Sequence, residues 1–137
     1  DPAFMKLAEE CCVALCGRKK VVFDYNGWST GSSDFGDVTC VMPGVQINAG
    51  GAVGTLHGID FQITDPNRMC VNAAKVQLFL VDALLSNDAV AAKEIIANYK
   101  PQYPSIKAYL DAIDALTLDK DAVKYDEKGN AIVDFQN

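Results

Sequence analysis

The stretch that decides the fold runs from Ser29 to Pro66 and reads STGSSDFGDVTCVMPGVQINAGGAVGTLHGIDFQITDP. It holds seven of the ten glycines and the only histidine, His57. Its polar residues sit between glycines and prolines rather than along one helical face, which is typical of turns and loops. We therefore expect the ligand chemistry of this chain to lie in this stretch, with helices packed against it.

Helical signals flank the stretch on both sides. Asp1 and Pro2 have the composition of an N-cap and first helical position, and Gly17 suits a C-terminal stop. Apolar spacing and cap residues predict helices over 2–16, from Ser33 or Asp34 to about 41, over 66–85, for about ten residues after a break at 86–88, and from Pro104 onward. The helix over 66–85 is apolar nearly all round, so we expect it to be buried on more than one side.

Strand signals are fewer than helix signals. Short β-prone runs occur at 21–23 and 45–48, and the segments 122–125 and 132–135 flank a glycine-containing turn that predicts a terminal β-hairpin. The order of elements predicts an α/β fold in one domain, residues 1–137. Two central strands leave exposed sheet edges, so we expect the other strands to come from sequence outside this chain or from a second copy.

Composition excludes several classes of protein. The formal net charge of −6 argues against nucleic-acid binding, which needs a basic face. The N-terminal residues lack the pattern of a signal peptide, and we see no apolar run of membrane-spanning length. Five cysteines, an odd number without a CxxC pair, predict reduced thiols in a cytoplasmic protein. Cys12 and Cys16 could ligate a metal from one helical face, but small buried side chains are the favoured interpretation.

His57 is the first candidate for chemistry. It follows the strand predicted at 45–48, and α/β folds place ligands in loops beyond strand ends. An imidazole there ligates a metal or carries a proton; alternatively, it is a loop histidine bonded to a backbone carbonyl. Because no second histidine exists, a metal would need Asp, Glu or Cys ligands, or ligands from outside the chain.

The second candidate is the turn Gly31-Ser32-Ser33-Asp34. Glycine permits close approach of a ligand, and hydroxyl and N–H groups at a helix start bind anions such as a substrate carboxylate. The alternative is an ordinary N-cap. Asn48 and the pair Gly50-Gly51 are further candidates for lining the same cleft.

Several short motifs follow one another in a fixed order: GSSDFGDV at 31–38, VMP at 41–43, GGAVG at 50–54, HG at 57–58 and DFQITDP at 60–66. Together with the helix that follows, this set resembles the C-terminal part of the catalytic domain in metal-dependent amidohydrolases of the aminoacylase and p-aminobenzoyl-glutamate hydrolase type. Those enzymes belong to the metallopeptidase clan with two co-catalytic metals.

The resemblance implies a role for three residues. His57 matches the last metal-ligating histidine of the family, and Gly31 and Ser32 match the turn that holds the substrate's carboxylate. It implies two divalent ions, zinc first and manganese or cobalt otherwise, and a small amide substrate of the N-acyl, aminobenzoyl or dipeptide type. It also implies a cytoplasmic homo-oligomer that binds neither nucleic acid nor membrane.

The resemblance further implies part of a three-layer sheet-and-helix domain, followed by a helical segment and a β-hairpin. The family's other metal ligands, its general-base glutamate and its dimer-forming lid precede this region, so this chain supplies no catalytic residue and should be inactive alone. Two alternatives stay open: a binding or interaction module, and a structural fragment that self-associates through bare apolar surface.

Overall fold

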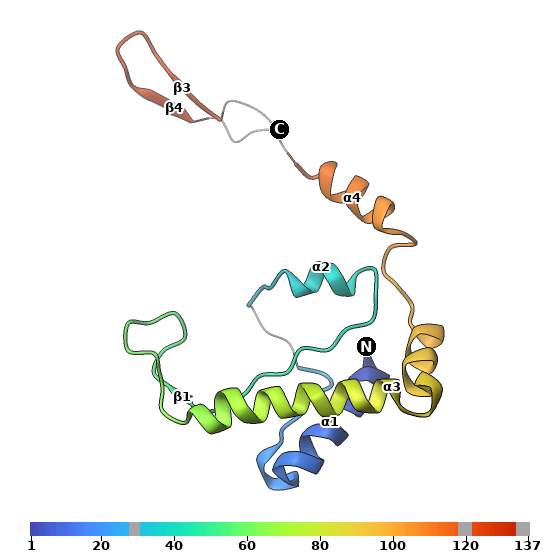
Figure 1. The fold of residues 1–137 in the computed structure, drawn as a ribbon. Helices are drawn as coiled ribbons and strands as arrows, with labels where there is room; N and C mark the ends of the chain where they lie inside the picture. The colour runs from blue at the N-terminus through green and yellow to red at the C-terminus, as the bar shows by residue number, and fades with distance from the viewer. Residues whose placement is uncertain (28–30, 118–121, 134–137) are drawn as a thin grey trace. The chain divides into compact units, whose positions relative to one another are not determined.

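A computed structural model describes residues 1–27, 31–117 and 122–133 of the chain. These residues form two compact units, Asp1–Gln102 and Tyr103–Asn137, which are described separately. The elements of the first unit are α1 (Pro2–Cys16), η1 (Arg18–Lys20), α2 (Phe35–Thr39), β1 (Ala52–Val53), β2 (Gln62–Ile63), η2 (Asn67–Val71) and α3 (Asn72–Asn98) (Figure 1). Those of the second unit are α4 (Ile106–Asp114), β3 (Val123–Tyr125) and β4 (Ala131–Val133).

The first helix forms as its terminal residues predict. An Asp1 side-chain oxygen accepts a hydrogen bond from the Phe4 N–H at 2.9 Å, and Pro2 occupies the first helical position. The helix ends at Gly17, whose φ of 80° lies in the left-handed region open to glycine. The predicted bounds of this helix, 2–16, are confirmed.

The longest helix, α3, is broken where the sequence predicts a break. Ser86 has an extended ψ of 155°, and the next three residues, Asn87, Asp88 and Ala89, have positive φ values between 52° and 58°. Left-handed backbone disfavours residues that carry a β-carbon, and Asn and Asp tolerate it best. The break turns the chain sharply between the two helical parts (Figure 1).

The core of the described chain is a narrow seam between α1 and α3, which pack together. We call it the α1–α3 seam, and its buried residues are Ala8, Cys11 and Cys12 of α1 with Val76 and Ile95 of α3. Ala8 is fully inaccessible, so the two helices approach closely at this small side chain. All five cysteines are free, as predicted, and Cys11 and Cys12 are buried as small core residues.

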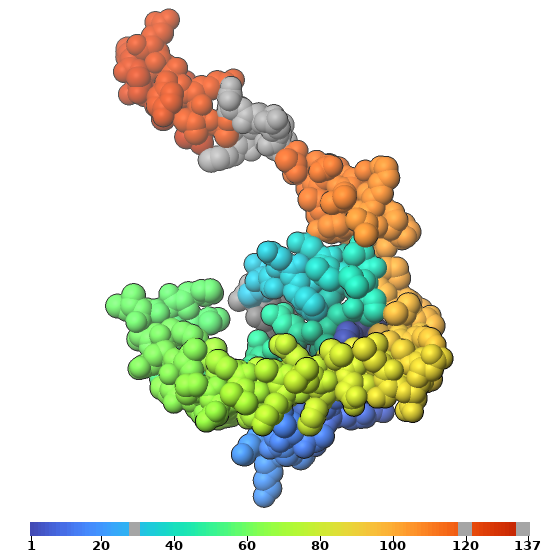
Figure 2. Space-filling model, viewed as in Figure 1, coloured from blue at the N-terminus to red at the C-terminus, as the bar shows by residue number. Residues whose placement is uncertain are grey.

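The prediction that residues 66–85 are buried on more than one side is wrong for the described structure. Leu78, Val81 and Leu85 are 67%, 52% and 64% exposed. At 100° per residue they lie 140–200° around the helix from the buried Val76, so α3 buries one side and leaves the opposite side bare. Space-filling atoms of α3 accordingly lie at the surface along the helix (Figure 2).

The helix from Asn67 to Asn98 is long and apolar enough to cross a membrane by length and composition. It is the one such helix in the part of the chain that the structure describes. Lys75 and Asp82 lie within it, and the left-handed break divides it after Leu85. Length and composition alone do not separate a membrane span from a helix that packs on protein.

Two strand predictions are wrong. Residues 21–23 and 45–48 form no strand in the structure, because a strand needs a neighbouring strand to bond and neither segment has one among the described residues. Instead, β1 and β2 form an antiparallel pair with Ala52 opposite Ile63, in a region expected to be a flexible loop. The mixture of helices and small sheets agrees with the α/β prediction at this coarse level.

In the second unit, the Ser105 hydroxyl accepts a hydrogen bond from the Ala108 N–H and caps α4 at its predicted start. The predicted hairpin is confirmed as the antiparallel pair of β3 and β4, with Lys124 opposite Ile132. The end of the predicted second strand, residues 134 and 135, lies outside the described residues, as do Ser29 and Thr30 of the glycine-rich stretch.

Candidate functional site

His57 lies in the connection between β1 and β2, which projects from the rest of its unit (Figures 1 and 2). Short hydrogen bonds close this connection: the Gly58 N–H donates to the Thr55 carbonyl at 2.7 Å, and the Phe61 N–H donates to Gly58 at 3.2 Å. Oδ2 of Asp60 accepts from the N–H of Thr55 at 3.1 Å and from its hydroxyl at 3.3 Å. The loop therefore has a defined backbone although its residues are mostly exposed.

Glycine is required at the base of this loop. Gly54 has a φ of 95°, and a β-carbon there would lie 2.2 Å from the Asp60 carbonyl oxygen. His57 itself has a φ of 65°, a conformation uncommon for residues other than glycine, though His is among those that adopt it more often. Such strained positions are frequent at ligand sites, where the surrounding structure maintains them.

The His57 imidazole is exposed, and within residues 1–27, 31–117 and 122–133 no group hydrogen-bonds to it. The same residues contain no group of three His, Cys, Asp or Glu side chains that could hold a metal. The described structure therefore offers one imidazole ligand and no complete metal site. The remaining ligands of a metal at His57 would have to come from elsewhere.

Gly31 and Ser32 are exposed and lie immediately before α2. The hydroxyl of the neighbouring Ser33 accepts a hydrogen bond from the Phe35 N–H at 3.2 Å, a local turn bond beside the helix start. Asp34 stands at the N-cap position without a side-chain cap bond. The role of Gly31 and Ser32 in holding a carboxylate stays a prediction.

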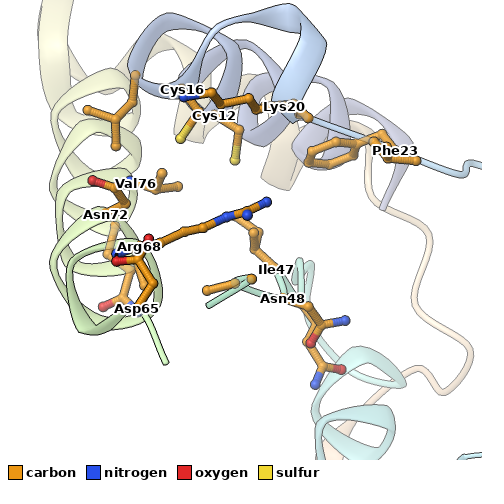
Figure 3. A pocket seen from close by; sticks show the side chains of 18 of the residues that line it. Cys12, Cys16, Lys20, Phe23, Ile47, Asn48, Asp65, Arg68, Asn72 and Val76 are labelled. Carbon is orange, nitrogen blue, oxygen red and sulfur yellow. Dashed lines mark hydrogen bonds between the residues drawn. The ribbon is translucent and has the colours of Figure 1, made fainter. Parts of the chain in front are cut away.

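A separate hollow of about 740 Å³ lies between α1, the start of α3 and the segments 21–24 and 46–50. Its polar lining includes Lys20, Arg68, Asn48 and Asn72, and its apolar lining includes Ile47 and Val76 (Figure 3). None of Gly31, Ser32 and His57 is among the described residues that line it. Asn48 and Gly50 line this hollow, but Gly51 and the turn at 31–34 do not, so the described structure does not bring them into one cleft with the candidate turn.

Sequence reasoning missed the two basic residues of this hollow. Lys20 lies in η1, and Arg68 lies at the start of the long helix, in the region predicted as helix over 66–85. Arg68 lies in η2, a π-helical turn at the start of the long helix, and wider turns of this kind are frequent at functional sites. The cap-like pair Asp65-Pro66 marks the helix start, but nothing in the sequence indicates that Arg68 and Lys20 share a cavity.

The cysteines of α1 are poor metal ligands in this fold. Burial raises the pKa of the Cys12 thiol, and the neighbouring Cys16 adds to the effect. Burial likewise raises the pKa of Cys11. Because metals bind the thiolate, a raised pKa disfavours ligation. This result agrees with the interpretation of Cys12 as a core side chain, whereas Cys16, for which burial was also expected, is only half-buried.

Tyr25 and Arg18 both contact Glu9 on the surface of the first unit. The Tyr25 hydroxyl donates to Glu9 Oε2 at 2.5 Å, and Arg18 forms an ion pair with the same carboxylate. The Tyr25 hydrogen bond, followed by the Arg18 hydrogen bond, lowers the pKa of Glu9. The cluster fixes the chain after α1 to the helix.

No family model, curated protein or solved structure matches this chain.

Proposed function

We propose that this chain supplies one metal ligand, His57, and a carboxylate-binding turn, Gly31-Ser32, to a metal-dependent amidohydrolase with two divalent ions. The substrates would be small amides of the N-acyl, aminobenzoyl or dipeptide type, and zinc is the first choice of metal, with manganese or cobalt as others. The observation that carries the proposal is the exposed His57 ring, which no described residue hydrogen-bonds, on a loop with a defined backbone.

The loop around His57 suits a metal ligand better than an ordinary surface turn. Gly54 and the Asp60–Thr55 bonds fix the backbone on both sides of the imidazole, which limits the positions the ring can take. A ligand held in position loses less conformational entropy when a metal binds. The absence of a bond to the ring among the described residues leaves either nitrogen open to ligate.

The chemistry of such a site divides between this chain and its surroundings. When bound, the two ions would lower the pKa of a water and polarise the amide carbonyl. This chain's part is to offer the His57 lone pair and, through the Ser32 hydroxyl and the Gly31 backbone, to orient the substrate's carboxylate. No base or second ligand is assigned to this chain, so we expect no hydrolysis by these 137 residues alone.

The bare side of α3 supports the proposal that a further layer completes this domain. Leu78, Val81 and Leu85 would bury substantial apolar area beneath a sheet, as in a three-layer arrangement of helices around strands. The hollow lies on the opposite, Val76 side of α3, so a layer on the bare side would leave it open. We propose that this layer and the remaining metal ligands come from sequence outside this chain.

The single histidine makes the metal role directly measurable. Titrating the chain with zinc while recording the His57 ring resonances by NMR reports on this imidazole and on no other. We expect the resonances to shift with weak, pH-dependent affinity, because zinc must displace the ring proton. The variant His57→Gln should lose this weak site, while thiol binding, monitored in parallel at the exposed Cys70, should persist in it.

Two results would refute the proposal. One is zinc binding that leaves the His57 resonances unmoved and is equal in His57→Gln. The other is turnover of an N-acyl amino acid by the purified chain that a chelator abolishes, because it would mean that these residues hold a complete site.

The bare side of α3 also favours a second candidate, a structural segment that self-associates. Sedimentation or light scattering over a range of concentrations distinguishes the two. A dimer that Leu85→Asp disrupts, combined with no zinc effect on His57, would favour self-association as the role of the chain.

A further inference from the structure

The hollow beside the α1–α3 seam contains two basic side chains without an acidic partner. Lys20 and Arg68 both line it, and neither forms an ion pair with any residue that the structure describes. Figure 3 shows Arg68 extending from the helix start into the hollow, with Lys20 on the side lined by α1. Two carboxylates, those of Asp24 and Asp65, line the same hollow, but neither forms an ion pair with Lys20 or Arg68.

The two acidic residues of the hollow are engaged elsewhere. Asp65 Oδ1 accepts a hydrogen bond from the Arg68 backbone N–H at 2.9 Å, which caps the helix start. Asp24 Oδ1 accepts from the Asn26 N–H at 3.0 Å within its own turn. Because neither carboxylate pairs with Lys20 or Arg68 among the described residues, the guanidinium and the ammonium can contact another anion.

The position of Arg68 depends on Gly50. A β-carbon at Gly50 would lie 3.1 Å from Arg68 Nε and 3.2 Å from its Cζ and one terminal nitrogen. Glycine therefore lets the guanidinium lie against the backbone of this segment. The adjacent Gly51 accepts hydrogen bonds from the N–H groups of Thr64 and Asp65, which holds the same segment close to the helix start.

We propose that this hollow binds a small organic anion whose carboxylate or phosphate group contacts Arg68 and Lys20 and whose apolar body lies against Ile47 and Val76. A guanidinium presents a planar fork of donors that matches carboxylate and phosphate oxygens. The amide side chains of Asn48 and Asn72 supply further donors in the same cavity. A volume of about 740 Å³ is within the range typical of small-molecule sites.

This site is independent of the proposed hydrolase role, because His57, Gly31 and Ser32 do not line the hollow. Three probes test it on the full chain at constant ionic strength: phenyl phosphate, benzoate and the neutral methyl benzoate. We expect saturable binding of phenyl phosphate and benzoate, seen as shifts of the backbone amides of Arg68, Asn72 and Val76. Whichever of these two probes binds with the higher affinity shows whether the site prefers a phosphate or a carboxylate group. Methyl benzoate should not bind measurably.

Three variants separate geometry from net charge. Arg68→Gln should weaken binding by at least about tenfold, the factor that one lost charge-assisted bond typically represents. Gly50→Ala keeps every charge but places a methyl group against the guanidinium, so it should weaken binding severalfold. The matched control Lys75→Gln removes one positive charge from α3 outside the hollow and should change the affinity less than twofold.

Equal weakening by Lys75→Gln and Arg68→Gln would overturn the proposal, because net charge alone would then explain binding. Binding of methyl benzoate as tight as that of benzoate would also overturn it, as would a lack of saturation at millimolar concentrations. Should Arg68→Gln not fold, as judged by circular dichroism, Lys20→Gln and Gly50→Ala carry the same test.

Discussion

The α1–α3 seam and the β1–β2 loop lie in one compact unit but are held together by different means. The seam buries side chains, among them Ala8 and Ile95, and uses no buried polar group. The loop buries almost nothing, and its shape depends on Gly54 and on hydrogen bonds from Thr55 to Asp60. The seam resists unfolding because unfolding would expose its apolar side chains to water. The loop keeps its shape through backbone conformation and hydrogen bonds.

Global stability and the position of the candidate ligand His57 therefore depend on different regions of the molecule. Global stability comes from the seam, because apolar burial is the main favourable term in folding. The position of the candidate ligand His57 comes from the loop, where a change in one glycine moves the ring without uncovering any core residue. Substitutions in the two regions should therefore have distinct signatures: a lowered melting temperature in the seam and a local spectral change in the loop.

The largest effect is expected from Ile95→Ala in the seam. Ile95 is 7% exposed, and removing its buried atoms should reduce the free energy of unfolding by about 2–5 kcal/mol. Its neighbour Ile96 is 65% exposed, so Ile96→Ala should change the same quantity by less than about 0.5 kcal/mol. Thermal unfolding of the two variants measures the contrast, and equal melting temperatures would show that the seam is not the core.

A smaller and local effect is expected from Gly54→Ala in the loop. The new methyl group meets the Asp60 carbonyl at a backbone φ that alanine disfavours, a strain of about 1–3 kcal/mol. We expect the amide resonances of 52–63 and the His57 ring to shift while those of the seam stay in place. The control Gly36→Ala, at an open helical position, should be neutral or stabilising by up to about 1 kcal/mol. An unchanged loop spectrum for Gly54→Ala would contradict the geometry described for β1 and β2.

The smallest effect is expected in the second unit. In its turn between β3 and β4, as in the β1–β2 loop, an aspartate carboxylate accepts hydrogen bonds from residues of the same turn. Hydrogen bonds from the Asn130 side chain, and then from its backbone N–H, hold the pKa of Asp126 below its ordinary value of 3.8. A lowered folded-state pKa means that the stabilisation is present above the ordinary value and is lost as pH falls through the lowered one.

Amide shifts of β3 and β4 should therefore change on acidification below the ordinary pKa. Asp126→Asn should remove this pH dependence, and Glu127→Gln, in the same turn, should leave it intact. A pH dependence that survives in Asp126→Asn would assign the titration to another group.

The sequence predicted the helices well because their signals are local. Asp1, Pro2 and Gly17 determine α1 through caps that need no distant partner, and Ser105 does the same for α4. The break after Leu85 was also predictable, since Ser, Asn and Asp in succession favour non-helical backbone. These features depend on residues within one or two turns of each other.

The strands and the hollow depend on distant residues and were predicted poorly. The segments 21–23 and 45–48 have strand-like composition, but composition does not supply the partner strand that a ladder requires. The pairing of β1 with β2 depends on positive φ at Gly51 and Gly54, which allows two short and unremarkable segments to meet. Lys20 and Arg68 share a cavity only because α1 packs against α3, and no spacing in the sequence reveals that.

The long helix bends sharply at the left-handed residues Asn87, Asp88 and Ala89. Beyond it, the Tyr99 hydroxyl donates to the Thr39 carbonyl, and the Gln102 N–H donates to Cys40 at 3.0 Å, both at the end of α2. These bonds anchor the far end of the segment that carries Gly31 and Ser32 into α2. The direction of the anchoring chain is set by the four non-helical residues 86–89. If this bend were straightened, Tyr99 and Gln102 would move away from α2. The orientation of the candidate turn therefore depends on backbone torsions more than fifty residues further along the sequence.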